Sequence, residues 1–482
     1  MNKDLHIKKN KLILTSFNII YLISLLFYFF QFKNYYYDAA SVEKVLFPWI
    51  AISFIIHIIN FKIRQYKLYD FGMWYILLSY VFLFGLLFRE YFSLNYSLVW
   101  NPIKYFSNIE LTKAYFFSLI SLNCFSIGYF VLKKDSSNKP KDYDKLNEKK
   151  VQQMFLIGLI LTLIGGICMI INDIKVINVM KTYNSYIGYK YANESGILDD
   201  IAILFLPGLF LLFYSGKIKD KPAKCMFIFT IIYFIIVMML TGSRKVKLFS
   251  IVSLFLGYNF VPKNQKKSKK SFLKVILYIF LAFILFNVLF TIRDNRFELS
   301  NIIPIFFKNI KEMKFFKDMF GEIFSETGLT LLSIASIMRL VPSVFPYQYG
   351  LTFIKTIPSF LPIGWLIGDF FSGASSTNII NTYANLPLGS SLIGDLFWNF
   401  GMVGGFFASF IFGILIASLF NLINKNNDRI GMAIYFSIFS QLLMLVRAEL
   451  FDIFRPLVII LIIDFILRKT YFPLRGGNNY EK

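Results

Sequence analysis

The sequence predicts an all-α polytopic membrane protein. Its 482 residues are 56% hydrophobic and 19% aromatic, which leaves too little polar surface for a soluble protein of this length. Apolar stretches of about 17–23 residues recur along the whole chain and are long enough to cross a hydrocarbon core roughly 30 Å thick. Lys and Arg residues cluster between these stretches, as in the inner loops of membrane proteins.

The apolar stretches divide the chain into about twelve predicted transmembrane helices. The first is too long for the apolar core of a cleaved signal peptide and many others follow it, so we interpret it as a retained span. The tenth contains Gly401, Gly404 and Gly405 and is long enough to be kinked or re-entrant. The predicted spans are 12–32, 46–61, 71–88, 112–132, 151–171, 198–215, 225–241, 246–261, 272–291, 392–423, 430–447 and 454–468.

The distribution of Lys and Arg predicts that both termini are cytoplasmic. With the N-terminus inside, the inner segments carry most of the cations of the short loops, notably in 133–150 and 262–270. Such loops account for the net charge of +23, so we do not interpret this charge as a nucleic-acid-binding surface.

One predicted outer segment, 292–391, is much longer than the other loops. Its residues 302–324 place lysines on one side and Phe, Ile and Met on another, which predicts an amphipathic helix lying in the membrane interface. An apolar piece broken by Pro and Gly, 350–371, and a polar stretch, 372–391, follow. We therefore expect a single integral membrane domain, 1–482, with one large extracytoplasmic loop.

Arginines occur at several predicted outer span ends, where cations are usually scarce. For each one alone, a membrane anchor or a surface salt bridge is an equally good explanation. As a set they predict a binding site, because guanidinium groups stay charged and match diphosphate oxygens with paired hydrogen bonds. A diphosphate at the outer membrane surface indicates a polyprenyl-diphosphate lipid as the ligand. These arginines, with those of the large loop, are Arg244, Arg293, Arg296, Arg339, Arg447 and Arg455.

Other patterns typical of catalytic or metal sites are weak. Asp142 and Asp144 form an acidic pair, but it lies in a lysine-rich inner linker. His6 is in the N-terminal tail and His57 lies inside a predicted span, so no histidine falls in a predicted outer loop. The three cysteines lie in or beside apolar runs and predict no disulfide framework. We expect neither a metal nor a cofactor.

The segment LPLGSSLIGDLFWNFGMVGGFFASFIFGIL, 386–415, resembles the signature of the Wzy-type polymerases of O-antigen and capsular repeat units. In that family a polar loop leads to an acidic residue, an aromatic residue, Asn-Phe-Gly and a glycine-rich span. TGSR at the outer end of a span and Arg447-Ala-Glu449 between the last two spans are also similar. The resemblance covers about 240–455 and the overall topology.

The resemblance implies a GT-C-like glycosyltransferase of the bacterial cytoplasmic membrane, with its active site on the outer face. Its substrates would be oligosaccharide repeat units carried on undecaprenyl diphosphate. The growing glycan would pass from its carrier to the non-reducing end of a fresh unit. The flippase and the chain-length regulator of the same pathway would be its partners, besides the membrane lipids.

Under this interpretation the outer arginines stabilise the diphosphate leaving group. The acceptor hydroxyl needs a base and, because the outer loops contain no histidine, a carboxylate must serve. Three carboxylates predicted at the outer surface are candidates, and the sequence does not rank them: Glu326, Asp395 and Glu449.

Two other functions remain as alternatives. A ligase that moves finished polymer to another acceptor is a similar multi-span enzyme, but such ligases typically use a histidine in the large loop. A flippase for lipid-linked oligosaccharides would also need many spans. Transporters, however, usually have two related halves and polar groups near the membrane midplane. The charges of this chain instead gather at one face.

Overall fold

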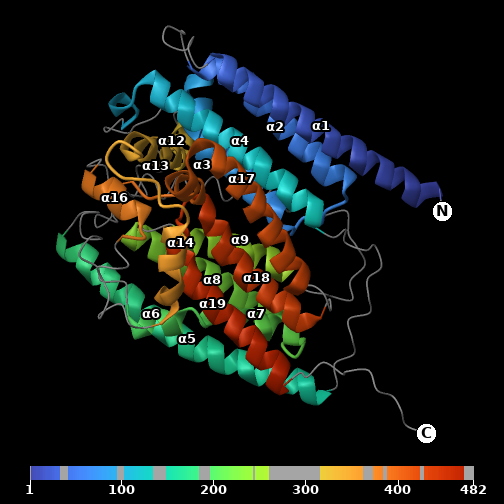
Figure 1. Ribbon diagram of the computed structural model, residues 1–482. Coiled ribbons are helices and arrows are strands. Elements are labelled where there is room, and N and C mark those ends of the chain that lie inside the picture. The colour runs from blue at the N-terminus through green and yellow to red at the C-terminus, as the bar shows by residue number, and fades with distance from the viewer. Residues whose placement is uncertain are drawn as a thin grey trace.

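The computed structural model describes residues 2–32, 42–94, 102–133, 148–183, 196–242, 245–259, 315–361, 373–383, 388–423 and 428–471 (Figure 1). Within these ranges the chain forms helices and short turns and no strand, so the predicted all-α class is confirmed. The helices are α1 (Asn2–Phe32), α2 (Val42–Ile63), α3 (Phe71–Tyr91), η1 (Pro102–Tyr105), α4 (Asn108–Leu132), α5 (Glu148–Tyr183), α6 (Ile197–Ala202), α7 (Phe205–Ser215), α8 (Asp220–Thr241), α9 (Lys245–Asn259), α12 (Phe315–Thr327), α13 (Leu329–Leu340), α14 (Leu351–Thr356), η3 (Ile357–Phe360), α16 (Ser376–Tyr383), α17 (Leu392–Ile423), α18 (Arg429–Leu443), η4 (Met444–Val446), α19 (Leu450–Ile466) and η5 (Leu467–Tyr471).

In the described part of the chain, 10 segments are long and apolar enough to cross a membrane, which confirms a polytopic architecture. All but one of them coincide with predicted spans. The predicted spans 246–261 and 454–468 correspond to α9 and α19, which are shorter helices of 15 and 17 residues. The predicted span 272–291 lies outside the described residues. The number twelve and the likeness to GT-C enzymes therefore stay predictions.

The remaining candidate span, Phe320–Leu340, falls within the predicted large loop and combines α12 with α13. α12 packs against α3, and α13 packs against α3 and α4. The backbone of Phe324 and Gly328 approaches Gly85 of α3 so closely that a Cβ at Gly85 would collide with it. Residues 302–314 of the predicted amphipathic helix, 302–324, lie outside the described residues. The described residues 315–340 pack into the helical bundle.

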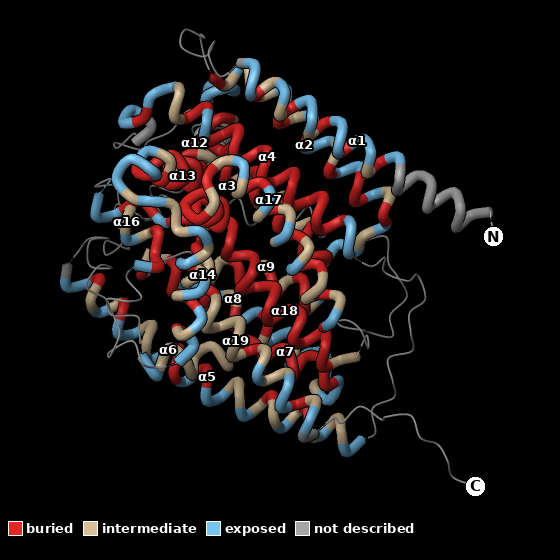
Figure 2. The backbone as a smooth tube through the Cα atoms, in the orientation of Figure 1, coloured by how far each residue is buried: buried red, intermediate tan, exposed pale blue. Residues whose placement is uncertain are grey.

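The core of the bundle runs along α4 and α18, whose surfaces are almost wholly covered by other helices (Figure 2). α17 lies against α4 at backbone contact, because Gly128 and Gly413 face carbonyl oxygens of the opposite helix where a Cβ would not fit. α1, α2 and α5 lie at the periphery and keep exposed apolar faces. Such faces are typical of helices that contact lipid.

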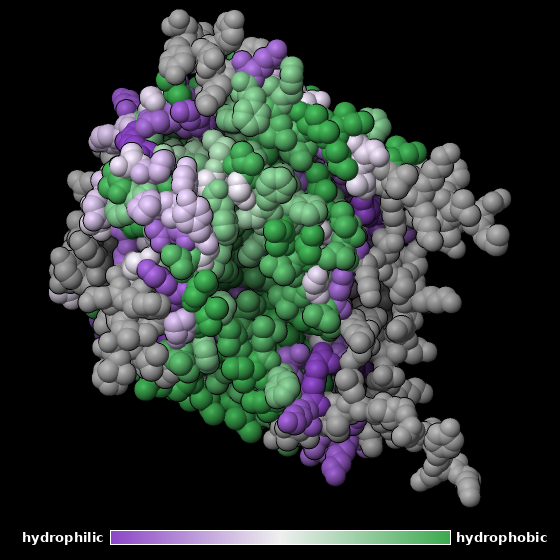
Figure 3. All heavy atoms as spheres, viewed as in Figure 1, coloured by the Kyte–Doolittle hydropathy of each residue, from purple (hydrophilic) through white to green (hydrophobic). Residues whose placement is uncertain are grey.

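The two ends of the bundle carry separate sets of polar contacts. At one end, the Asn421 side chain of α17 donates to the Leu132 carbonyl at the end of α4. At the same end, Arg468, just after α19, pairs with Asp428 at the start of α18. The start of α1 lies at this same end, and α16 lies at the opposite one (Figure 1). We call the latter the α16 end. Hydrophobic surface separates hydrophilic groups at the two ends (Figure 3).

α17 has a kink at Gly401, as its glycine content predicts. Gly401 has φ 67° and ψ −162°, a conformation that a side chain would strain. The segment before α14 fits into this break, because the Tyr349 backbone N–H donates to the Asn399 carbonyl (2.8 Å) and the Gly350 N–H to the Asn399 side chain (3.0 Å). The kink thereby joins the predicted large loop to the first turns of α17.

The predicted orientation can be tested by cysteine labelling in cells. We expect a membrane-impermeant maleimide to label Asn378→Cys, on the exposed side of α16, in intact cells whose outer envelope has been permeabilised. Lys219→Cys, which is exposed at the opposite end, should react only after the cytoplasmic membrane is opened. Both variants need the Cys225→Ser background, because Cys225 is exposed. The reverse labelling order would show that the bundle is inverted.

Candidate active site

Two of the predicted carboxylates, Asp395 and Glu449, lie together at the α16 end. Asp395 is in the first turn of α17, and Glu449 immediately precedes α19. The Ser376 hydroxyl joins them: its Oγ contacts Asp395 Oδ1 and lies 2.8 Å from Glu449 Oε2. Both carboxyl groups are buried, with exposed fractions of 5% and 3%. The sequence predicts each residue separately, and the fold makes them a pair.

Glu449 binds the N-terminus of α16. Its Oε2 accepts the Thr377 backbone N–H at 3.0 Å, and its Oε1 accepts the Ser375 hydroxyl at 2.6 Å. A helix N-terminus favours a negative group, since its first N–H groups lack partners within the helix. Burial, together with the nearby Asp452 carboxylate, nevertheless raises the pKa of Glu449 above its ordinary value.

Asp395 binds the N-terminus of a second helix, because its Oδ2 accepts the Leu450 backbone N–H of α19 at 2.9 Å. The pair thus holds α16 and α19 against the start of α17. Ser375, Ser376 and Ser390 complete this cluster, and none of them is among the residues predicted from the sequence. The feature of the sequence that could have indicated these serines is the polar stretch 372–391, which has serines at both of its ends.

The third predicted carboxylate, Glu326, lies opposite Arg447. An Nη2 of Arg447 is 3.8 Å from Glu326 Oε1, and their side chains are 30% and 14% exposed. Within the described residues, no hydrogen bond to the guanidinium of Arg447 is present. Arg447 precedes Glu449 by two residues, so the accessible pair and the buried pair share one turn of the chain. This part of the site combines a cation with free donors and a carboxylate that solvent reaches.

Arg339 and Arg455, also predicted to bind a diphosphate, bind protein groups. Arg339 forms a two-pronged ion pair with Glu110, at 2.6 and 2.8 Å. Arg455 donates to the carbonyls of Ser359 (2.7 Å) and Leu361 (3.0 Å) and pairs with Asp200 at 3.0 Å. In this conformation both arginines tie loop segments to helix ends, and their predicted contact with substrate stays a prediction.

Substitution of Arg455 separates these two roles. We expect Arg455→Ala to lower the free energy of unfolding by about 2 kcal/mol, because two carbonyls and Asp200 lose hydrogen bonds to a charged group. Thermal unfolding of the detergent-solubilised protein measures this loss. A normal unfolding temperature combined with lost activity would instead favour direct contact of Arg455 with the substrate.

Arg244, Arg293 and Arg296 lie outside the described residues. The residue after Arg244 is described: Lys245 pairs with Asp452 in the first turn of α19. Lys247 pairs with Asp173 of α5 at 2.9 Å, in a partly buried position beside Tyr233. The start of α9 therefore lies at the α16 end, near the turn that carries Arg447.

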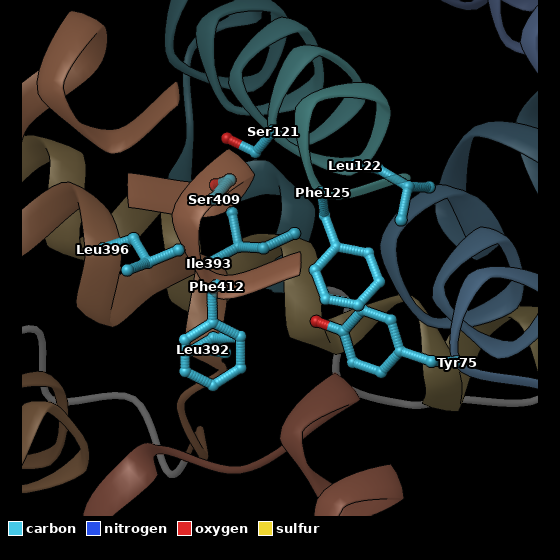
Figure 4. Close-up of a pocket in the computed structure, with 9 residues that line it drawn as sticks. All are labelled: Tyr75, Ser121, Leu122, Phe125, Leu392, Ile393, Leu396, Ser409 and Phe412. Atoms are coloured by element: carbon cyan, nitrogen blue, oxygen red, sulfur yellow. The ribbon is translucent and has the colours of Figure 1, made fainter. Parts of the chain in front are cut away.

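A small cavity behind the carboxylate pair does not extend the site. It lies between α3, α4 and α17, and the same turn of α17 that carries Asp395 forms one wall (Figure 4). Its lining is apolar apart from hydroxyl groups and contains no charged residue. The lining residues are Tyr75, Ser121, Leu122, Phe125, Leu392, Ile393, Leu396, Ser409 and Phe412. No group of three or more His, Cys, Asp or Glu side chains suited to a metal occurs in the described ranges.

Comparison with known proteins assigns the family. A family model described as O-antigen polysaccharide polymerase Wzy matches residues 13–470, nearly the whole chain. The chain belongs to this family. The resemblance detected in residues 386–415 is thereby confirmed, and the ligase and flippase alternatives are set aside. No curated protein and no solved structure matches the chain.

This Wzy polymerase therefore joins repeat units into O-antigen polysaccharide, and the repeat units are lipid-linked. Its many apolar helices make it a multi-pass membrane protein, as a polymerase that acts on lipid-linked substrates requires. The cluster at the α16 end is the candidate site for this reaction, since it gathers all three predicted carboxylates.

Proposed function

We propose that the α16 end transfers a growing glycan from undecaprenyl diphosphate to the non-reducing end of another carrier-linked repeat unit. The α16 end would face the outer side of the bacterial cytoplasmic membrane, with both termini in the cytoplasm. Since the donor brings its own leaving group, no nucleotide sugar is needed there.

The observation that carries this proposal is the pairing of Arg447 with Glu326. A guanidinium with unused donors suits a diphosphate oxygen, and a carboxylate within 3.8 Å suits an acceptor hydroxyl. Both side chains are partly exposed, whereas Asp395 and Glu449 are buried behind α16. Of the three predicted bases, Glu326 is therefore the one we assign to the acceptor.

The proposed step balances as a single glycosyl transfer. The acceptor hydroxyl oxygen attacks the anomeric carbon of the donor glycan, and its proton passes to Glu326. The bond between this carbon and the diphosphate oxygen breaks, and the electron pair leaves with undecaprenyl diphosphate. Arg447 stabilises the charge that develops on the leaving oxygen, where a fixed cation has its largest effect.

The remaining outer arginines would complete the diphosphate site. Arg244 is adjacent to Lys245, whose ion pair with Asp452 supports a position near α19. Arg293 and Arg296 follow the predicted ninth span and would approach from the large loop. Apolar helix faces would hold the prenyl chains, and two lipid-anchored substrates meeting in one plane gain proximity. The flippase that delivers the units and a chain-length regulator would be the protein partners.

Reconstitution in liposomes tests the proposal. The wild-type protein with one synthetic repeat unit on undecaprenyl diphosphate should produce a ladder of polymers and release one undecaprenyl diphosphate for each bond formed. The same oligosaccharide on undecaprenyl monophosphate is the matched control and should give no ladder. A ladder of equal yield from the monophosphate would overturn the assignment of a diphosphate leaving group.

A further inference from the structure

The contacts of Ser376 restrict the protonation of the buried carboxylate pair. Its Oγ lies within hydrogen-bond distance of three oxygens, those of Ser390 (2.7 Å), Glu449 (2.8 Å) and Asp395. A serine hydroxyl has one hydrogen to donate and accepts two hydrogen bonds. The Ser376 hydroxyl cannot donate to both carboxylates. If both were ionised, the Ser376 oxygen would therefore contact one carboxylate oxygen with no hydrogen between them, which is repulsive. At least one carboxyl group must bring its own proton.

The other partners of the pair identify which group carries that proton. Glu449 accepts from the Thr377 N–H and the Ser375 hydroxyl, so both of its oxygens face donors. Asp395 Oδ2 accepts the Leu450 N–H, but its Oδ1 faces only the Ser376 hydroxyl among the described contacts. A proton on Asp395 Oδ1 satisfies every group: it donates to Ser376, and Ser376 donates to Glu449.

We propose that Asp395 is a neutral carboxylic acid in this protein and that the chain Asp395–Ser376–Glu449 positions the active-site turn. Ser376 and Asp395 are then positioning residues. The inference rests on the proposed function only for its consequence, which is the placement of Arg447. The protonation itself follows from the hydrogen bonds.

The positioning is mediated by Glu449. Its carboxylate accepts the Thr377 N–H and so holds residues 447–449 at the N-terminus of α16. Asp395 accepts the N–H of the next residue, Leu450, and so holds it against α17. Arg447 lies in this fastened turn and therefore keeps its distance from Glu326. Other charged groups near the turn are Asp452 and its partner Lys245. A single negative charge on the buried pair is consistent with this mixed surrounding.

Infrared difference spectroscopy of the purified protein tests the protonation without any substrate. We expect a carbonyl band typical of a buried protonated carboxylic acid in the wild-type protein and its loss in Asp395→Asn. Absence of the band from the wild-type protein would overturn the shared proton. Retention of the band in Asp395→Asn would show that another carboxyl group, and not Asp395, carries the proton.

Cysteine protection tests the positioning. Ile380, fully buried on the inner side of α16, is replaced by cysteine in the Cys225→Ser background. An asparagine at 395 can donate to Ser376 and accept from Leu450, so Asp395→Asn should keep the thiol protected, whereas Asp395→Ala should expose it. Glu449→Gln should raise the labelling rate about tenfold, because an amide turns a donor toward other donors.

Equal labelling rates in Asp395→Asn and Asp395→Ala would overturn the positioning role, because neither the hydrogen bonds nor the shape of the side chain at 395 would then matter to α16. Neither measurement depends on polymerisation. If the band and the protection behave as expected but the diphosphate assay fails, the buried chain stands and the proposed function falls. If the diphosphate assay gives a ladder but the band and the protection do not behave as expected, the positioning role falls and the proposed transfer stands.

Discussion

Arg447→Ala is expected to reduce ladder formation by about 100- to 1,000-fold, the range found when a preorganised donor to a developing negative charge is removed. In the proposed transfer the leaving diphosphate gains charge as the glycosidic bond breaks. Of the predicted diphosphate-binding arginines in the described ranges, Arg447 is the one whose guanidinium has no hydrogen bond to a described residue. Its five donors are therefore available to oxygen atoms of the carrier. Quantified gels of reconstituted protein at equal expression measure the effect.

Matched variants separate charge from geometry. Arg447→Lys keeps the charge but loses the planar fork, so its activity should fall between those of the wild type and of Arg447→Ala. Lys104→Ala removes an exposed cation from the same end and should leave the ladder intact. The unfolding temperature of Arg447→Ala should stay within a few degrees of the wild type, because the guanidinium makes a single long ion pair among the described residues. A full-length ladder from Arg447→Ala would show that the arginine is an anchor.

The sequence was sufficient to predict the class of the fold because lipid imposes a simple rule. Every backbone group in the hydrocarbon must bond within its own helix, so length and hydropathy identify spans directly. The same rule does not apply where a segment is sheltered by other helices. α13 carries polar residues such as Ser333 and Ser336, both buried against neighbouring helices. The sequence prediction places this segment in a loop, whereas in the structure it packs against α3 and α4.

The sequence supplies individual candidate residues, whose roles stay predictions, but not their arrangement. The sequence predicts Glu326 in the large outer loop and Asp395, Glu449 and Arg447 near outer span ends, and the fold gathers all four at the α16 end. Their division into a buried pair and an accessible pair depends on α16, whose small polar residues carry no strong pattern. A serine is recognised as part of a site only from the groups that it contacts, and the sequence does not show that Ser376 contacts Glu449.

The stretch around Arg244 is a second case in which the sequence supplies the charged residues but not their partners. The stretch MMLTGSRKVKLF, 238–249, places three cations at a predicted outer turn. Two of them now have partners: Lys245 pairs with Asp452, and Lys247 pairs with Asp173 in a partly buried position. These ion pairs account for both lysines without contact with lipid headgroups. Opposite charges on α5 and α19 instead fix the start of α9 beside the proposed active-site turn.

Glu326→Gln is expected to reduce the rate of transfer by about 100- to 10,000-fold, the usual contribution of a positioned general base. The amide matches the carboxylate in shape but cannot take the proton of the acceptor hydroxyl, so the substrates should still bind. Retention of a fluorescent carrier-linked unit on the reconstituted variant measures binding, and single-turnover release of undecaprenyl diphosphate measures the chemical step. Asp395→Asn is the matched control, since it makes the same exchange at a buried carboxyl group that we assign as neutral. If Asp395→Asn blocked transfer and Glu326→Gln did not, the base would lie in the buried pair, and α16 would have to move before the acceptor could reach it.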